Sequence, residues 1–408
     1  MTKKSDAPAI RFKGFSDAWE QRKLGDMMNV TSVKRIHQSD WTDSGVRFLR
    51  ARDIVAAAKN EEPDDYLYIS KEKYEEYSAL SGKVGVSDLL VTGVGTIGVP
   101  YLVRNLEPLY FKDGNIIWFQ NSDKIDGKFL FYSFSAEQIQ GFINESAGIG
   151  TVGTYTIESG KKTPISLPNQ IEQAKVGELF QQLDNLITLH QRKFEKLTNV
   201  KKSMLEKMFP QNGSSYPEIR FKGFTDPWEQ RKAKELFVST ADKGYPELPV
   251  LSATQDRGMI RRDENSINIF HDKKNEAGYK RVLPGQFVIH LRSFQGGFAH
   301  SAIEGITSPA YTVFGFSEPE KHDSEYWKYV FTSKSFIQRL ETVTYGIRDG
   351  RSISYEEFLT LGFVYPSKAE QTAIARYLDK LSDLITLHQR ELEKLQNIKK
   401  SMLEKMFV

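Results

Sequence analysis

The sequence predicts an α+β fold: two mixed α/β domains in a pseudo-two-fold arrangement, separated by two long antiparallel coiled-coil helices. Three observations lead to this prediction: an internal repeat, two long segments of helical periodicity inside the repeat, and short strand-like runs between the repeated parts. A chain of 408 residues also exceeds the size of most single hydrophobic cores, so two or more domains are expected.

The repeat consists of two blocks with different spacing. Ile10–Lys23 recurs as Ile219–Lys232 with 12 of 14 positions identical, and Leu186–Phe209 recurs as Leu384–Phe407 with 20 of 24 identical. The first block is repeated after 209 residues and the second after 198, so the segments between the blocks differ in length. The chain is therefore two copies of one plan, each with a shared arm, a divergent segment and a shared helical block.

This plan gives the predicted domain boundaries. We expect, in order, a flexible tail at 1–9, an arm at 10–23, a first divergent domain at 24–160, a spacer-helix block at 161–209, a linker at 210–218, the repeated arm at 219–232, a second divergent domain at 233–358 and a second spacer-helix block at 359–408. Runs of β-branched and aromatic residues predict strands at Val46–Arg52, Asp88–Thr92, Asn115–Phe119, Gln286–His290 and Ala310–Phe314, whereas 122–146 and 324–344 favour helices.

Each shared block has the pattern of one long helix. Asn169 and Ser367 follow prolines and stand three residues before Glu172 and Glu370, which is the capping-box pattern of a helix start. Apolar residues then recur at steps of three and four, as in a coiled-coil seam, at Val176, Leu179, Leu183, Leu186, Leu197, Val200 and Met204 and at Ile374, Tyr377, Leu381, Leu384, Leu395, Ile398 and Met402. A helix of about 40 residues measures about 60 Å, and the linker spans at most about 30 Å, so the second helix is expected to run back antiparallel to the first.

The composition excludes several functional classes. The chain has no cysteine, which excludes disulfides, thiol catalysis and thiolate metal sites. It has no apolar run of about 18 residues, and Met1–Asp6 lacks the apolar stretch of a signal peptide, so a cytoplasmic location is expected. The net charge of +3 is only mildly basic, so DNA binding would depend on local basic patches or on a partner.

The repeated blocks resemble the conserved regions of the specificity subunits of Type I restriction-modification systems. The resemblance rests on Phe12–Lys23 in the arm and on Leu186–Leu197 and Lys201–Phe209 in the helical block, and in order, duplication and length it covers the whole chain. It implies that each divergent domain is a target-recognition domain for one part of a split double-stranded DNA target, and that the paired helices fix the gap between the parts.

The same resemblance implies partners and assigns the chemistry to them. Two modification subunits would use S-adenosylmethionine to methylate adenine N6, and restriction subunits would translocate and cleave DNA with ATP. S-adenosylmethionine, ATP and Mg are accordingly expected in the partner subunits, and no cofactor is expected in this chain.

Residues that contact DNA are expected on loops of the two divergent domains, because Arg, Gln, Ser and Thr side chains can bond to base edges. In the first domain we predict Arg50, Arg52, Thr92 and Thr96. In the second domain we predict Thr254, Gln255, Arg257, Arg292, Ser293, Gln295, Arg348 and Arg351. The alternative for each residue is a phosphate contact or a solvated side chain.

Two glycine-rich segments, Gly93–Gly98 and Gly148–Gly153, match the GxGxxG pattern of nucleotide-binding loops. Neither Val99–Pro100 nor Thr154–Ile157 is expected to open a helix that could bind a pyrophosphate. We therefore interpret both segments as turns, which either bring the backbone close to DNA or are purely structural.

His190 and His388 occupy equivalent positions in the repeat. We interpret them as polar residues that set the register of the helices or contact a partner, rather than as metal ligands. A group of repeated lysines is interpreted as the exposed face of the helices, with a partner surface as the alternative; its members are Lys201, Lys202, Lys207, Lys399, Lys400 and Lys405.

No catalytic pattern is recognised. The sequence contains no HExxH, GxSxG, P-loop or adenine-methyltransferase Asn-Pro-Pro-Tyr motif, so we expect a non-catalytic chain without a metal site. Two alternatives stay open, a restriction protein with a cryptic nuclease site and a stand-alone DNA-binding scaffold.

The purified chain is expected to neither methylate nor cleave DNA, because no site for either reaction is recognised. The measurement is incubation of the chain with DNA, S-adenosylmethionine, ATP and Mg²⁺, followed by mapping of methylated adenines and strand breaks. Methyl transfer without a modification subunit would contradict this expectation.

Overall fold

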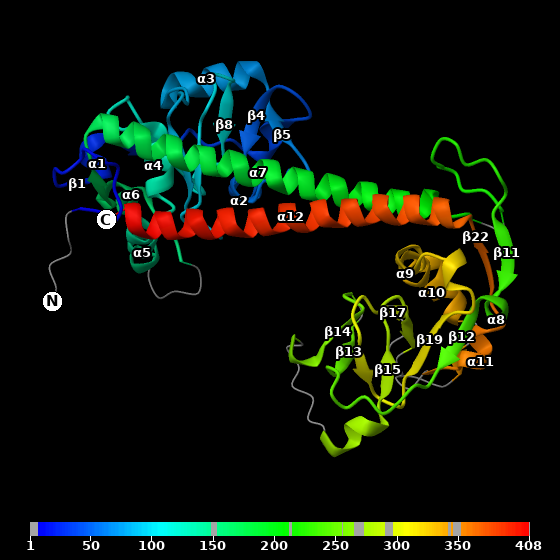
Figure 1. Ribbon diagram of the computed structural model, residues 1–408. Helices are drawn as coiled ribbons and strands as arrows, with labels where there is room; N and C mark the ends of the chain where they lie inside the picture. Colours follow the sequence, from blue (N-terminus) through cyan, green and yellow to red (C-terminus); the bar gives the residue numbers. More distant parts are fainter. Residues whose placement is uncertain are drawn as a thin grey trace. The chain divides into compact units, whose positions relative to one another are not determined.

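The computed structural model describes residues 7–147, 153–211, 214–254, 256–264, 273–289, 297–341, 344–345 and 352–407. The chain divides into two compact units: unit 1 contains Met1–Lys193 and His388–Val408, and unit 2 contains Phe194–Leu387. Each unit combines strands with helices and includes parts of both long helices, α7 (Gln170–Lys207) and α12 (Lys368–Met406) (Figure 1). The predicted α+β fold class is confirmed.

Unit 1 is built on two four-stranded sheets. One has the order β2-β9-β6-β7 and is antiparallel throughout; the other has the order β3-β5-β4-β8, with β4 and β8 parallel. The elements before α7 are β1 (Glu20–Lys23), α1 (Leu24–Met27), β2 (Asn29–Thr31), β3 (Trp41–Thr42), β4 (Val46–Leu49), α2 (Ala51–Ala58), β5 (Leu67–Ile69), α3 (Lys71–Ser81), β6 (Leu89–Thr92), β7 (Pro100–Leu102), β8 (Leu109–Phe111), β9 (Ile116–Gln120), α4 (Gly127–Ser133), α5 (Glu137–Ser146), α6 (Ile157–Lys162) and β10 (Pro164–Leu167).

Unit 2 repeats the first of these sheets strand by strand. Its order β12-β19-β16-β17 corresponds to β2-β9-β6-β7, although the two divergent segments differ in sequence. The elements before α12 are β11 (Glu229–Lys232), α8 (Ala233–Leu236), β12 (Phe237–Thr240), β13 (Leu251–Ala253), β14 (Met259–Arg261), β15 (Lys280–Val282), β16 (Phe287–Ile289), β17 (Ala299–His300), β18 (Gly305–Thr307), β19 (Thr312–Phe316), α9 (Ser324–Phe331), α10 (Lys334–Glu341), β20 (Thr344–Tyr345), β21 (Ser352–Ile353), α11 (Tyr355–Phe358) and β22 (Gly362–Tyr365).

The local predictions are confirmed for strands and incomplete for helices. Every predicted strand overlaps an observed strand, and the two predicted helical segments contain α4, α5, α9 and α10. The strand predicted at Val46–Arg52 is wrong in its last residues, because α2 begins at Ala51. The carboxylate of Asp53 accepts a hydrogen bond from the Arg50 amide at 2.8 Å, which caps the first turn of this helix.

The arm of each copy ends in a strand that pairs with the strand before a long helix. β1 pairs antiparallel with β10 in unit 1, and β11 pairs antiparallel with β22 in unit 2. All four residues of β1 are exposed, as are all four of β11. No alternation of apolar and polar residues in these strands therefore indicates that they pair with another strand. The sequence therefore predicts the repeat of the arm but not its partner strand.

An arginine in each arm forms a buried ion pair with the first turn of a long helix. Arg11 donates to Glu172 at 2.6 and 2.8 Å, and Arg220 donates to Glu370 at 2.7 Å through two nitrogens. The glutamate side chains are 0% and 1% exposed. The capping-box prediction is thus only partly right, because Asn169 does accept from the Glu172 amide at 3.0 Å but the glutamate carboxylate binds the arm.

An aromatic side chain at the end of each long helix completes the core of a unit. In unit 1, Phe407 follows α12 and its ring centroid lies 6.3 Å from that of Trp19 in the arm. In unit 2, Phe209 follows α7 and its ring centroid lies 6.4 Å from that of Trp228. These residues are equivalent in the repeat, so one packing arrangement is built twice.

Contacts within unit 1 show that α7 and α12 run antiparallel there. Asp184 of α7 pairs with Lys399 of α12 at 2.6 Å, and His190 of α7 contacts His388 of α12. The residue numbers of the contacts increase along α7 and decrease along α12, as in an antiparallel pair. Within the described ranges, none of the helices combines the length and the apolar character needed to cross a bilayer.

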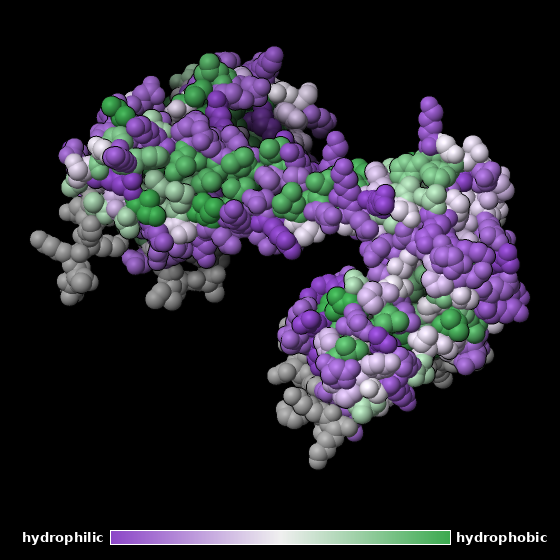
Figure 2. Space-filling view, in the orientation of Figure 1, coloured by the Kyte–Doolittle hydropathy of each residue, from purple (hydrophilic) through white to green (hydrophobic). Residues whose placement is uncertain are grey.

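The apolar seam is buried only in part. Four predicted members have 8% exposure or less, namely Val176, Leu183, Ile374 and Leu381. Leu186 is 44% exposed and Ile398 is 37% exposed, so these two members of the predicted seam are not buried. Apolar surface along the helices of unit 1 is visible in Figure 2.

Two of the repeated lysines are not on an exposed helix face, which corrects their interpretation. Lys399 pairs with Asp184, and its ammonium lies 5.6 Å from the ring centroid of Tyr132. Lys201 lies 5.6 Å from the ring centroid of Tyr329 in unit 2. Burial, and then the charge of Lys328, lower the pKa of Lys201. Both lysines pack a long helix against the domain of their unit.

Replacement of Arg220 by Ala is expected to lower the free energy of unfolding by about 3–5 kcal/mol, because it leaves the Glu370 carboxylate buried without its partner. Urea denaturation followed by circular dichroism measures the change. Arg22→Ala is the matched control, since Arg22 and Glu20 form an exposed pair with side chains 48% and 64% exposed. Arg22→Ala should lower the free energy of unfolding by less than about 1 kcal/mol. Equal losses in the two variants would contradict the role given to the buried pair.

Candidate nucleic-acid interface

In unit 1 the strand register brings several connections to one edge of the sheets. Ile116 at the start of β9 lies opposite Thr92 at the end of β6, and the Ser32 hydroxyl donates to the Ile116 carbonyl at 3.3 Å. The Lys112 amide donates to the Leu49 carbonyl at the end of β4 at 2.8 Å. The connections that meet here are 32–37, 50–53, 93–99 and 112–115, and we call them the loop edge of unit 1. Three of the DNA-contact residues predicted for the first domain, Arg50, Arg52 and Thr96, belong to it, and the fourth, Thr92, is the last residue of β6.

The two predicted arginines of this edge are held by acidic side chains to different degrees. Arg50 donates to Asp53 at 2.8 and 3.0 Å and to Asp65 at 2.8 Å, and its side chain is only 14% exposed. Partial burial by itself would lower the pKa of Arg50, but the carboxylates of Asp53 and Asp65 raise it above its usual value. Arg52 is 63% exposed and pairs with Asp65 at 2.6 Å. In this structure Arg50 supports the fold, and Arg52 is the more accessible of the two.

The predicted threonines occupy the base and the tip of the β6–β7 connection. Thr92 is fully buried, and its hydroxyl donates to the Thr96 carbonyl at 2.5 Å and accepts from the Val99 amide at 2.9 Å. This hydroxyl cannot reach DNA in the observed conformation. Thr96 is exposed at the tip, next to Gly95, whose φ of +78° favours glycine.

Internal packing accounts for the glycines of the first GxGxxG segment. A Cβ at Gly93 would lie 2.6 Å from the Tyr155 carbonyl oxygen, and one at Gly98 would lie 3.1 Å from Ile143. The structural interpretation of this turn is therefore sufficient, and no nucleotide is needed to explain it.

The second GxGxxG segment is largely outside the described residues, which resume at Gly153. A short helix does follow it, because α6 begins at Ile157 with the Thr156 hydroxyl accepting from the Ser159 amide. The helix has only six residues, so it offers little of the aligned dipole that binds a pyrophosphate.

Unit 2 has a corresponding loop edge. Ile289 at the end of β16 lies opposite Thr312 at the start of β19, as Thr92 lies opposite Ile116 in unit 1. Val250 and Ile306 form a parallel bridge, so the connections after β13 and β18 leave at the same edge. The described residues of this loop edge are 241–249, 254, 256–258 and 308–311.

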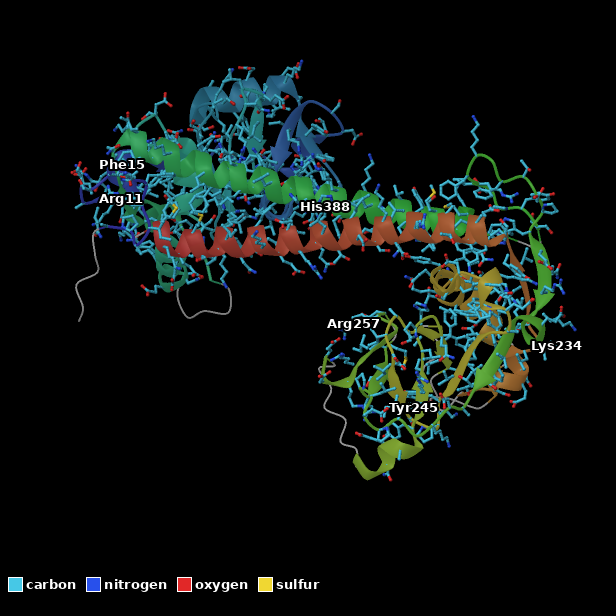
Figure 3. The ribbon with its side chains drawn as sticks, in the orientation of Figure 1. Arg11, Phe15, Lys234, Tyr245, Arg257 and His388 are labelled. Carbon is cyan, nitrogen blue, oxygen red and sulfur yellow. The ribbon has the colours of Figure 1, made fainter. Side chains whose placement is uncertain are left out.

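The β13–β14 turn carries three of the predicted residues of the second domain, of which Thr254 and Arg257 are described. The Thr254 hydroxyl donates to the Gly258 carbonyl at 2.8 Å and accepts from the Arg257 amide at 3.0 Å. A Cβ at Gly258 would lie 2.3 Å from the His300 carbonyl oxygen, so the base of the turn requires glycine. Arg257 is exposed (Figure 3). The turn thus holds an accessible arginine on a fixed backbone.

The remaining predicted residues lie outside the described residues: Gln255, Arg292, Ser293, Gln295, Arg348 and Arg351. Their chain positions still correspond to those in unit 1. Residues 290–296 connect β16 to β17, as 93–99 connect β6 to β7. Arg348 and Arg351 fall between α10 and α11, as the second GxGxxG segment falls between α5 and α6.

Several cations of the loop edges were missed by the sequence pattern. In unit 1 these are Lys34, Arg35 and Lys112, and in unit 2 they are Lys243 and Lys280. Burial, and then the charge of Lys243, lower the pKa of Lys280. Lys112 directly follows β8 and Lys280 begins β15, and such positions could have been found only by matching the strand orders of the two domains.

Within the ranges that the structure describes, no three His, Asp or Glu side chains are grouped closely enough to hold a metal ion. The loop edges therefore offer hydrogen-bonding and cationic groups, with acidic residues interspersed.

Comparison with known families matches residues 16–199 to the model of the Type I restriction modification DNA specificity domain. Two curated relatives are similar over part of the chain. The specificity subunit of the Type I restriction enzyme MjaVIII from Methanocaldococcus jannaschii is 27% identical over 46% of this chain and 44% of the relative. A putative Type I restriction enzyme specificity subunit, S.HindORF215P from Haemophilus influenzae, is 29% identical over 41% of each chain. The matched stretch thus spans less than half the length of either relative.

The fold is similar to that of a solved structure along the whole chain. The S subunit of a Type I restriction-modification system from M. genitalium superimposes with a TM-score of 0.59 at 12% identity, covering 98% of this chain and 99% of that one. The resemblance inferred from the repeated blocks is confirmed.

Proposed function

Residues 16–199 match the model of the Type I restriction modification DNA specificity domain, and from this premise we propose that the chain is the DNA-recognition subunit of a Type I restriction-modification complex. In this function each unit binds one half of a bipartite double-stranded target. The long helices set the gap between the halves.

One observation carries the proposal. Thr96 lies on the β6–β7 connection, and Arg292, Ser293 and Gln295 have the corresponding chain position, between β16 and β17, in the second copy of the same strand framework. Such an arrangement suits the recognition of two different half-targets, because base readout depends on loop side chains while the framework can stay constant. We retain Arg52, Thr96, Thr254 and Arg257 as the described candidates for DNA contact, with Lys34, Arg35, Lys112, Lys243 and Lys280 as candidates for phosphate contact.

Methylation and cleavage belong to partner subunits in this proposal. Two modification subunits would supply S-adenosylmethionine-dependent methyl transfer, and restriction subunits would supply the ATP-dependent reactions. Exposed leucines on the helices support a partner surface, since Leu186 and Leu189 in unit 1 are 44% and 46% exposed. Leu387, the equivalent of Leu189, is 50% exposed in unit 2. A large apolar side chain at half exposure on a helix is a common feature of protein interfaces.

Exchange of residues 24–147 for the equivalent segment of another specificity subunit is expected to change one half of the target and leave the other unchanged. Sequencing of methylated adenines in a genome that carries the complete system measures both halves at once. The reciprocal exchange of 233–345 is the matched control and should change only the other half. If either exchange alters both halves, the assignment of one half-target to each unit is wrong.

Insertion of four residues after Thr198 in α7 is expected to lengthen the gap by one or two base pairs. The insertion adds about 6 Å and about 400° of rotation, so the helix face shifts by only about 40°. The base pairs themselves rise about 3.4 Å each. Methylated sites mapped with the modification subunit present should show unchanged half-targets and a longer gap.

Insertion of two residues at the same place is the control. It turns the helix by about 200° and should prevent assembly. If the four-residue insertion leaves the gap unaltered, the proposal that the helices set the spacing between the half-targets is wrong.

A further inference from the structure

Two histidines at equivalent positions of the repeat face each other in unit 1. His190 lies on α7 and His388 on α12, and their Nδ1 atoms are 3.2 Å apart (Figure 3 labels His388). The ring centroids are 5.1 Å apart with an interplanar angle of 69°. Both rings are half-buried, so solvent can reach them.

The separation of the two nitrogens agrees with shared coordination of a metal ion. A Zn²⁺ ion binds imidazole nitrogen at about 2.0–2.1 Å, and two such ligands at a tetrahedral angle are about 3.3–3.4 Å apart. Imidazole is also a preferred ligand of Ni²⁺ and Cu²⁺. The observed separation is thus within a few tenths of an ångström of that of two ligands, and both rings must turn so that their Nδ1 lone pairs point at one ion.

The protonation state of the pair is suitable for ligation. Two facing Nδ1 atoms at hydrogen-bond distance require one donor and one acceptor, so at least one imidazole is neutral. If both rings are neutral, metal binding moves the shared proton from Nδ1 to Nε2 of the donor ring, and no net proton is released.

A third donor is available on α12. Glu391 follows His388 by three residues and so lies on the same face of the helix. Among the described residues no hydrogen bond or ion pair of Glu391 is found, and its side chain must rotate to join the histidines, since no three such groups are close enough in the present conformation. The equivalent residue in the other copy is Lys193, which follows His190 by three residues.

We propose that His190, His388 and Glu391 form a binding site for a divalent transition-metal ion, with Zn²⁺ as the principal candidate. The bound ion would connect α7 to α12 through the two facing histidines. This proposal revises the interpretation of the two histidines as residues without a ligand, and it does not depend on DNA binding.

The test is titration of the full-length chain with Zn²⁺ by calorimetry and with Co²⁺ by visible absorption. The expected results are one ion per chain, d–d bands of cobalt bound to nitrogen, and a rise in the thermal midpoint with metal concentration. His190→Gln and His388→Gln should each abolish all three. His37→Gln is the matched control, because His37 is an exposed histidine of unit 1, and it should leave all three unchanged.

The two repeat positions provide a second pair of variants. Lys193→Glu places a carboxylate at both positions and should lower the dissociation constant about tenfold, because it replaces a repelled charge by an attracted one. Glu391→Lys places a lysine at both positions and should raise the dissociation constant by a similar factor. Both changes are at partly exposed positions, and circular dichroism checks that the helices are intact.

Binding that survives His190→Gln or His388→Gln, or no binding by the wild-type chain, would overturn the proposal. Opposite shifts in the two charge variants together with loss in the histidine variants would support it. Sites of methylation in the complete system report separately on DNA recognition, so failure of the metal site and failure of the proposed function are distinguishable.

Discussion

The structure depends on the way each long helix serves both units. Unit 1 contains the start of α7 and the end of α12, and unit 2 contains the start of α12 and the end of α7. Each core is accordingly completed by an aromatic residue from the helix of the other copy, Phe407 in unit 1 and Phe209 in unit 2. The backbone follows the same rule, because the Ile10 amide donates to the Lys405 carbonyl and the Ile219 amide donates to the Lys207 carbonyl. Neither half of the sequence can therefore complete its own core.

This constraint explains which parts of the sequence are repeated and which diverge. The shared contacts use the arms, the long helices and the capping residues of α4 and α9. For example, the Gln173 amide group accepts from the Asp126 backbone and donates to the Pro168 carbonyl, and Gln371 makes the same two bonds with Asp323 and Pro366. None of these contacts uses a side chain of the described loop edges. Substitutions at the loop tips can therefore change DNA contacts at little cost to the shared framework.

The sequence predicts the elements whose signal is local and periodic. Both long helices start within a residue of their predicted capping positions, and the five predicted strands are present because β-branched and aromatic runs pack well in a sheet. Features that depend on a distant partner could not be predicted. Glu172 has a capping-box position, yet only the folded chain brings Arg11, 161 residues away, to its carboxylate. Lys201 and Lys399 have the spacing of an exposed face, yet tyrosines of the domains cover them.

The candidate site is predictable at the level of loops and less so at the level of side chains, because the same residue types serve recognition and folding. Arg50 and Arg52 are two residues apart, but only the Arg50 guanidinium donates hydrogen bonds to the Asp53 carboxylate. Thr92 and Thr96 share one connection, and burial separates their roles. The shared framework has also diverged in its side-chain contacts. In unit 1 Asp184 binds Lys399, but the residue equivalent to Asp184 in unit 2 is Ser382. In unit 2 the contact is made instead by Asp379, which binds Lys328 and Tyr329. Two copies of one sequence plan thus reach the same backbone through different side-chain partners, so a contact seen in one copy cannot be transferred to the other by position alone.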